Sequence, residues 1–124
     1  MLVDTDIWID YLRGQPQADA FIESHAAHLF ISAGSVAELY QGVRDGKETA
    51  RLAKTLSATT ILPLTEEIAR QAGLYRRDYR STIGCGLADC MIAATANHHA
   101  LKIATLNARH FKILDDVITP YEKV

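Results

Sequence analysis

The chain begins MLVDTDIWIDYL, residues 1–12, and this stretch predicts the fold. Its first three residues form a short apolar run that predicts a buried strand, which ends at Asp4. Thr5 and Asp6 favour a helix start, and apolar residues then recur at helical spacing up to Leu12. A buried strand that leads directly into a helix is typical of an α/β domain, and here it leaves an acid at the carboxyl end of the strand.

The rest of the chain continues this alternation. Short apolar runs predict strands over residues 28–32, 59–62 and 101–106, with a last short strand at either 113–114 or 117–118. Helical spacing predicts helices over residues 16–25, 36–43 (capped by Ser35), 48–57, 65–80 and 87–99, the last apolar nearly all round and so buried. The pattern predicts one α/β domain over residues 1–124, with a central, mostly parallel sheet of four or five strands sandwiched by helices.

The composition is that of an ordinary globular domain: 124 residues, of which 48% are hydrophobic and 23% charged. These values exclude collagen-like and disordered chains. The net charge of −2 by itself argues against a nucleic-acid partner, but the charge is unevenly placed. Residues 1–38 hold six acidic residues and one basic residue, whereas residues 39–124 hold nine acidic and twelve basic residues. The total therefore weighs little against a nucleic-acid partner.

The chain shows neither a secretory signal nor an apolar run of about 18 residues, so we expect a cytoplasmic protein that does not span a membrane. Cys85 and Cys90 match neither a redox CxxC motif nor a zinc knuckle. We expect both to be buried free thiols in a reducing compartment.

Three acids occupy positions that a purely structural role explains poorly. Asp4 follows the first strand, Glu38 lies in a helix after the second strand, and Asp89 lies in the first turn of the buried helix. Each has a structural alternative: Asp4 as a helix cap, Glu38 as a solvent-facing residue, and Asp89 as an acid that answers the helix dipole. Ligands bind beyond the carboxyl ends of the strands in such sheets, so the three acids are predicted to converge there.

Converging carboxylates repel one another unless a cation neutralises them. A hard divalent cation such as Mg²⁺, or Mn²⁺ in its place, takes oxygen ligands and keeps several waters. Histidine and cysteine are missing from the set, which argues against zinc. The acids therefore predict a metal site that polarises a phosphate and lowers the pKa of a bound water.

Four blocks of the sequence together resemble the PIN-domain family, and bacterial VapC toxins in particular, over essentially the whole chain. They are LVDTD (2–6), SVAEL (35–39), LADCMIAATA (87–96) and TLNARHF (105–111). The resemblance implies a Mg²⁺-dependent endoribonuclease with a parallel sheet between helices. It implies a cognate antitoxin whose C-terminal segment covers the active site, and a homodimer.

The resemblance also assigns residues. Asp4, Glu38 and Asp89 match the three most constant acids of the family, with Asp4 and Asp89 as the principal metal ligands. Thr5 matches a hydroxyl residue that assists an acid or caps the helix, and Asp6 matches a position that varies among Asp, Asn and Ser. An antitoxin arginine that reaches these acids would replace the charge of the metal.

The fourth block departs from the fuller family pattern, in which another acid lies near the end of strand four. This chain has Asn107 and His110 at the candidate positions. Asn107 is predicted to hold a metal-bound water or to orient an acid, but it adds no charge, which argues against a tightly held second metal. His110 either donates to an RNA phosphate or is a packing or hydrogen-bonding residue beside Phe111.

Basic residues that follow Glu38 and lie along the helix at 65–80 are candidates for binding the RNA backbone: Arg44, Lys47, Arg76, Arg77 and Arg80. Tyr75 and Tyr79, interleaved with the arginines, could stack on unpaired bases. The alternative is a solvated helix face with ordinary salt bridges. Trp8 and Tyr11 are predicted to pack in the core or to line a groove for a partner peptide.

Other functions fit less well. A phosphoacceptor signalling domain needs an acid after its middle strand, where this chain has Pro63. An aspartyl-phosphate phosphatase starts with a DxD motif, as residues 4–6 do, but needs a downstream lysine and usually a larger chain. The remaining alternative to a ribonuclease is a non-catalytic PIN-like module that binds RNA or a partner, which the absent fourth acid favours.

Overall fold

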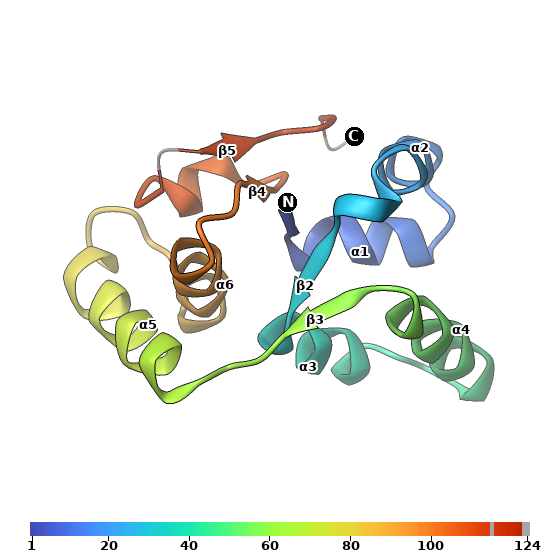
Figure 1. Ribbon diagram of the computed structural model, residues 1–124, viewed down its shortest axis with the longest axis horizontal. Coiled ribbons are helices and arrows are strands. Elements are labelled where there is room, and N and C mark those ends of the chain that lie inside the picture. Colours follow the sequence, from blue (N-terminus) through green and yellow to red (C-terminus); the bar gives the residue numbers. More distant parts are fainter. Residues whose placement is uncertain (115, 123–124) are drawn as a thin grey trace.

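A computed structural model describes residues 1–114 and 116–122 of the chain. Within them, a five-stranded parallel sheet has the strand order β3-β2-β1-β4-β5. Six α-helices and two short 3₁₀ helices surround the sheet in this described part. The predicted α/β fold is confirmed, with five strands that are all parallel (Figure 1).

The elements alternate along the chain much as the apolar pattern predicts. Their bounds are β1 Leu2–Val3, α1 Thr5–Leu12, α2 Pro16–Ser24, η1 Ala26–His28, β2 Phe30–Ser32, α3 Ala33–Gln41, α4 Gly46–Ser57, β3 Thr60–Leu62, α5 Glu66–Tyr79, α6 Leu87–His98, β4 Ile103–Ala104, η2 Ala108–Phe111 and β5 Val117–Ile118.

Successive strand residues point to opposite faces of the sheet and so build two cores. On one face, Val3 and Ile31 pack with residues of α1 to α4. On the other, Leu2 and Ile103 pack with Ile92 and other residues of α6. A smaller apolar cluster joins α5 to α6. Helices therefore cover both faces of the sheet, which explains why the strands are continuously apolar (Figure 1).

Strand β1 lies at the centre of the sheet, between β2 and β4. The chain proceeds outward on one side through β2 and β3, and later returns to place β4 on the other side of β1. The direction of the winding therefore changes between β1 and β4. A crevice for a ligand forms at the carboxyl ends of strands at such a point. Asp4 follows β1 and Thr105 follows β4, so both lie at this crevice.

Some predicted boundaries were wrong. Helix α3 begins at Ala33, because the Ser32 hydroxyl accepts a hydrogen bond from the Ser35 N–H and caps the helix. Ser35 is therefore inside the helix and not its cap. Strand β4 is shorter than residues 101–106. Of the two alternatives predicted for the last strand, residues 117–118 are confirmed as β5.

The predicted burial of α6 and of the two cysteines is confirmed. Residues Ile92 to Ala96 of α6 are all buried. Cys85 and Cys90 are buried free thiols whose Sγ atoms lie 3.2 Å apart. In residues 1–114 and 116–122, no helix combines the length and apolar character needed to cross a bilayer.

Candidate active site

Asp4 is the most buried acid of the candidate site, with 4% of its surface exposed. Its Oδ1 accepts a 2.7 Å hydrogen bond from the Thr5 N–H, which caps α1, and its Oδ2 accepts a 2.6 Å hydrogen bond from the Thr105 hydroxyl. Asp4 is therefore both a helix cap and a site residue. Each carboxylate oxygen has one protein donor, which leaves lone pairs on both oxygens free for a ligand.

The surroundings of Asp4 oppose its negative charge. Burial is the main cause that raises the pKa of Asp4 from 3.8 to about 6; the negative charges of Asp6 and Asp89 act in the same direction, and the hydrogen bonds from Thr105 and Thr5 oppose it. The shift shows that Asp4, Asp6 and Asp89 lie close enough to repel one another. A cation at this position would relieve both the desolvation and the repulsion.

Glu38 accepts a hydrogen bond from the Thr5 hydroxyl at the interface of α1 and α3. Thr5 Oγ1 lies 2.8 Å from Glu38 Oε1 and 2.8 Å from Ser35 Oγ, which in turn lies 3.1 Å from Ser32 Oγ. Thr5, Ser32 and Ser35 are all buried, whereas Glu38 is half-buried. Glu38 is therefore neither free in solvent nor part of the apolar core.

Asp89 lies in the first turn of α6 and is half-buried. Burial raises the pKa of Asp89, and the neighbouring His110 opposes this shift. His110 Nδ1 lies 3.2 Å from Asp89 Oδ2. His110 is therefore a hydrogen-bonding residue, which is one of its predicted roles, and its partner is Asp89.

Asn107 and Asp6 face each other across the site entrance. The Asn107 side-chain amide donates a short hydrogen bond to Asp6 Oδ2, and the Asn107 N–H donates to the Thr105 hydroxyl at 3.0 Å. The amide therefore orients an acid, which is one of the two roles that the sequence predicts for it.

The donor set suits a hard cation. The polar groups near Asp4 are carboxylate oxygens, hydroxyls and an amide, which are ligands or supports for Mg²⁺ or Mn²⁺. Among the described residues, however, no three His, Cys, Asp or Glu side chains lie close enough to hold one ion between them. The three predicted acids thus share one edge of the sheet without forming a three-residue cage. Asp4 and Asp89 with several waters remain the fitting arrangement.

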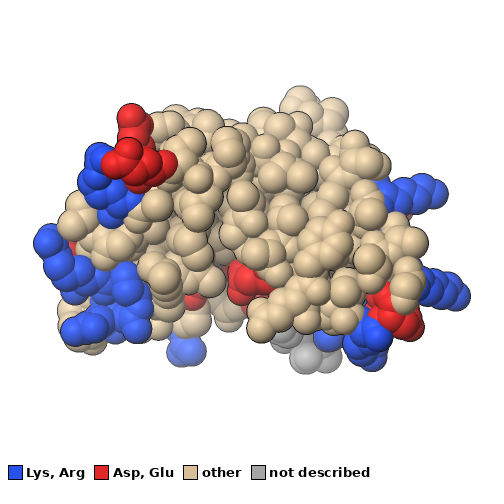
Figure 2. All heavy atoms as spheres, turned by 90° about the horizontal axis from the view of Figure 1, so that it is seen from below, with Lys and Arg blue, Asp and Glu red and all other residues tan. Residues whose placement is uncertain are grey.

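The basic residues predicted to bind RNA separate into two groups. Arg44 pairs with Glu48, and it lines a groove of α1, α3 and α4 together with Lys47. Arg77 pairs with Asp78, Arg80 is exposed at the end of α5, and Arg76 is half-buried. Figure 2 shows acidic side chains in a crevice near the middle of one face, with lysine and arginine side chains toward both ends.

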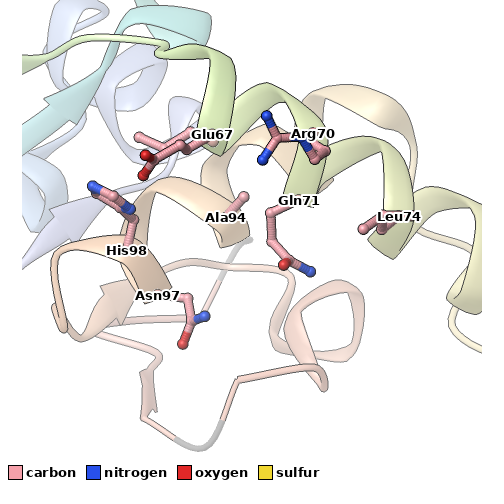
Figure 3. Close-up of a pocket in the computed structure, with 8 residues that line it drawn as sticks. Glu67, Arg70, Gln71, Leu74, Ala94, Asn97 and His98 are labelled. Atoms are coloured by element: carbon pink, nitrogen blue, oxygen red, sulfur yellow. The ribbon is translucent and has the colours of Figure 1, made fainter.

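Two hollows lie outside the Asp4 crevice. The groove of α1, α3 and α4 has a volume of about 400 Å³, an apolar floor that includes Leu39 and Leu52, and Glu38 on its lining. Trp8 is buried in the core, as one of its two predicted roles requires. A second hollow of about 310 Å³ lies between α5 and α6, lined by Glu67, Arg70 and other side chains (Figure 3). It contains none of the predicted site residues.

Ser35 and Thr105 are site residues that sequence reasoning missed. Ser35 stands inside the quoted SVAEL block and Thr105 begins the TLNARHF block, so their positions in these blocks were the available signal. Both are fully buried hydroxyl residues. Buried polar side chains need partners, and these two find theirs in Thr5 and Asp4.

A match to a protein-family model identifies the family of this chain. The PIN domain model matches residues 1–117. The chain belongs to the PIN-domain family. Ribonuclease VapC10 of Mycobacterium tuberculosis is 40% identical over 124 residues, which covers 98% of this chain and 92% of the relative.

Solved structures of similar fold agree with this assignment. A toxin–antitoxin complex from Klebsiella pneumoniae matches with a TM-score of 0.84 and 30% identity, and the match covers 98% of each chain. FitAcB from Neisseria gonorrhoeae matches with a TM-score of 0.77 and 32% identity, over 96% of each chain. The resemblance to VapC-type PIN domains that the four sequence blocks indicate is confirmed.

Proposed function

We propose that this PIN-domain protein is a Mg²⁺-dependent endoribonuclease of the VapC toxin type, with Mn²⁺ as a substitute, which acts in the cytoplasm. The observation that carries the proposal is the buried Asp4 carboxylate at the β1–β4 crevice, near Asp6 and Asp89. Similarity to a relative named Ribonuclease VapC10 supports RNA as the substrate.

Each site residue has a role in this proposal. Asp4 and Asp89 would hold the metal, which would polarise the phosphodiester and make a water easier to deprotonate. Glu38 orients the attacking water and accepts its proton. Thr5 supports Glu38, Asn107 fixes Asp6 beside Asp4, and His110 orients Asp89.

The substrate backbone would bind to basic residues around the crevice. Arg76 and Arg80 are the favoured contacts, because α5, which carries Arg76 and has Arg80 as its C-terminal cap, packs against α6, which carries Asp89. Arg44, Arg77 and Lys47 remain candidates, although Arg44 and Arg77 already have acidic partners.

A cognate antitoxin would restrain the activity, and the chain would form a homodimer. The toxin–antitoxin complex from Klebsiella pneumoniae supports an antitoxin partner. The groove of α1, α3 and α4 supports it as well, because an apolar floor beside Glu38 suits an apolar segment that carries a cation. The product of a small reading frame next to this gene is expected to abolish cleavage when added to the purified protein.

A non-catalytic PIN-like binding module is the second candidate, favoured by Asn107 at the position of a fourth acid. Cleavage of cellular RNA by purified protein separates the two. The ribonuclease cuts RNA with Mg²⁺ or Mn²⁺ and stops cutting with EDTA, and its cut sites can be mapped by sequencing RNA ends. A protein that binds RNA and never cuts it, with either metal, is the binding module.

A further inference from the structure

Three buried hydroxyls lead in a row to Glu38. The row runs from Ser32 to Ser35 (3.1 Å between Oγ atoms), from Ser35 to Thr5 (2.8 Å) and from Thr5 to Glu38 Oε1 (2.8 Å). Ser35 is fully buried and lies one turn before Glu38 on the same face of α3. Ser35 is farther from Glu38 in this row than Thr5, and its hydroxyl caps no helix.

The carboxylate determines the direction of every hydrogen bond in the row. An ionised carboxylate only accepts, so the single proton of the Thr5 hydroxyl goes to Glu38. Thr5 therefore has no proton left for Ser35, and Ser35 must donate to Thr5. The single Ser35 proton goes to Thr5, so the Ser32 hydroxyl must donate to Ser35, while the Ser32 oxygen accepts a hydrogen bond from the Ser35 N–H. One arrangement satisfies all three hydroxyls.

We propose that Ser35 is a positioning residue for the cleavage reaction, because its hydroxyl locks the Thr5 hydroxyl in the orientation that holds Glu38 Oε1. This inference rests on the proposed ribonuclease function. Without the Ser35 donor, the Thr5 hydroxyl rotates among its staggered positions and Glu38 loses a fixed partner. Glu38 is half-buried and carries three rotatable side-chain bonds, so a lost anchor spreads its carboxylate over several positions.

Ser32 provides the matched control. Both serines lie near the start of α3, but Ser32 caps the helix and Ser35 does not. The two alanine variants should therefore affect different properties: Ser32→Ala should lower stability, and Ser35→Ala should lower the cleavage rate. Ser32→Ala should lower the melting temperature by about 4 °C through loss of the cap and change cleavage less than twofold. Ser35→Ala should melt closer to the wild type and cleave about tenfold more slowly.

The experiment measures single-turnover cleavage of a short RNA, at saturating enzyme, together with melting curves. Ser35→Thr keeps a hydroxyl and should recover most of the rate. A matched pair at Thr5 gives an independent readout if Ser35→Ala folds poorly: Thr5→Ser keeps the hydroxyl and the rate, whereas the isosteric Thr5→Val loses both. Ser35→Ala in a Glu38→Gln background should cause no further loss, because both changes remove one function.

The outcomes decide between positioning and structural support. A rate of Ser35→Ala equal to the wild type overturns the proposal, and so does a tenfold loss that persists unchanged in the Glu38→Gln background. The proposal is also overturned if the cleavage rates of Ser32→Ala and Ser35→Ala fall in proportion to their melting temperatures. If the wild type cleaves no RNA at all, the proposed function fails and the role of Ser35 fails with it.

Discussion

Asp4 and Asp89 carry the same carboxyl group in contrasting surroundings. Asp4 is buried where β1 ends, with a hydrogen bond to each oxygen. Asp89 is half-buried in the first turn of α6 and has one side-chain partner, His110. We call the strand-end surroundings of Asp4 the floor of the crevice and the more open surroundings of Asp89 its rim. The difference indicates that Asp4 is held in one position by two hydrogen bonds, whereas Asp89 is more accessible to solvent.

The largest effect on RNA cleavage is expected from removing the negative charge of Asp4 or of Asp89. Asp4→Asn and Asp89→Asn should each reduce RNA cleavage by about 10³-fold or more, because each removes charge that stabilises the transition state. Circular dichroism should show that both variants stay folded. Glu23→Gln, an exposed acid on α2, is the control that should cut normally. Normal cleavage by both aspartate variants would contradict the assigned site.

The rim can be tested through His110. His110→Ala removes the partner of Asp89, and such a change typically weakens metal binding about 10-fold. Isothermal titration with Mn²⁺ measures the affinity directly, without RNA. His98→Ala, at the far end of α6, should bind Mn²⁺ as the wild type does. Equal affinities for both variants would show that His110 does not support the metal site.

The floor can be tested through the pH dependence of stability. The pKa of Asp4 is about 6 when folded and 3.8 ordinarily, so the folded state favours protonated Asp4. Its stabilising contribution in metal-free protein is thus complete below pH 4 and is lost as the pH rises through about 6. Asp4→Asn should raise the unfolding free energy at pH 7.5 by about 2 kcal/mol, and by nearly nothing at pH 4.

Denaturant unfolding in EDTA at both pH values measures this difference. Adding Mg²⁺ at pH 7.5 should stabilise the wild type and leave Asp4→Asn nearly unchanged. The half-buried Asp89 should show the same trend more weakly in Asp89→Asn. If Asp89→Asn changed the unfolding free energy more than Asp4→Asn does, the contrast between a buried floor and an open rim would be wrong.

The smallest effect is expected at the arginines around the rim. Arg76→Ala should weaken RNA binding and reduce the slope of log affinity against log salt by about 0.7, which corresponds to one phosphate contact with single-stranded RNA. Arg44→Ala should change both quantities less than Arg76→Ala does, because Arg44 already pairs with Glu48 beside the groove of α1, α3 and α4. Fluorescence anisotropy in EDTA, which prevents cleavage, measures both variants.

Much of the fold could be predicted because the apolar pattern is local. The strand at residues 2–3, the buried helix α6 and the parallel sheet all follow from it. The start of α3 was missed because the Ser32 hydroxyl caps the helix three residues earlier than Ser35 would. The end of β4 was missed because the length of a short strand depends on its neighbours β1 and β5.

The sequence by itself determined the family, through four blocks of residues, and it named the acids Asp4, Glu38 and Asp89. Tertiary structure alone decided how these acids are held. The Thr105 hydroxyl meets Asp4 across 101 positions of sequence, and Ser35 meets Thr5 across 30. Spacing along a chain carries no information about such pairs, because they form only when parallel strands bring distant residues to one edge of the sheet.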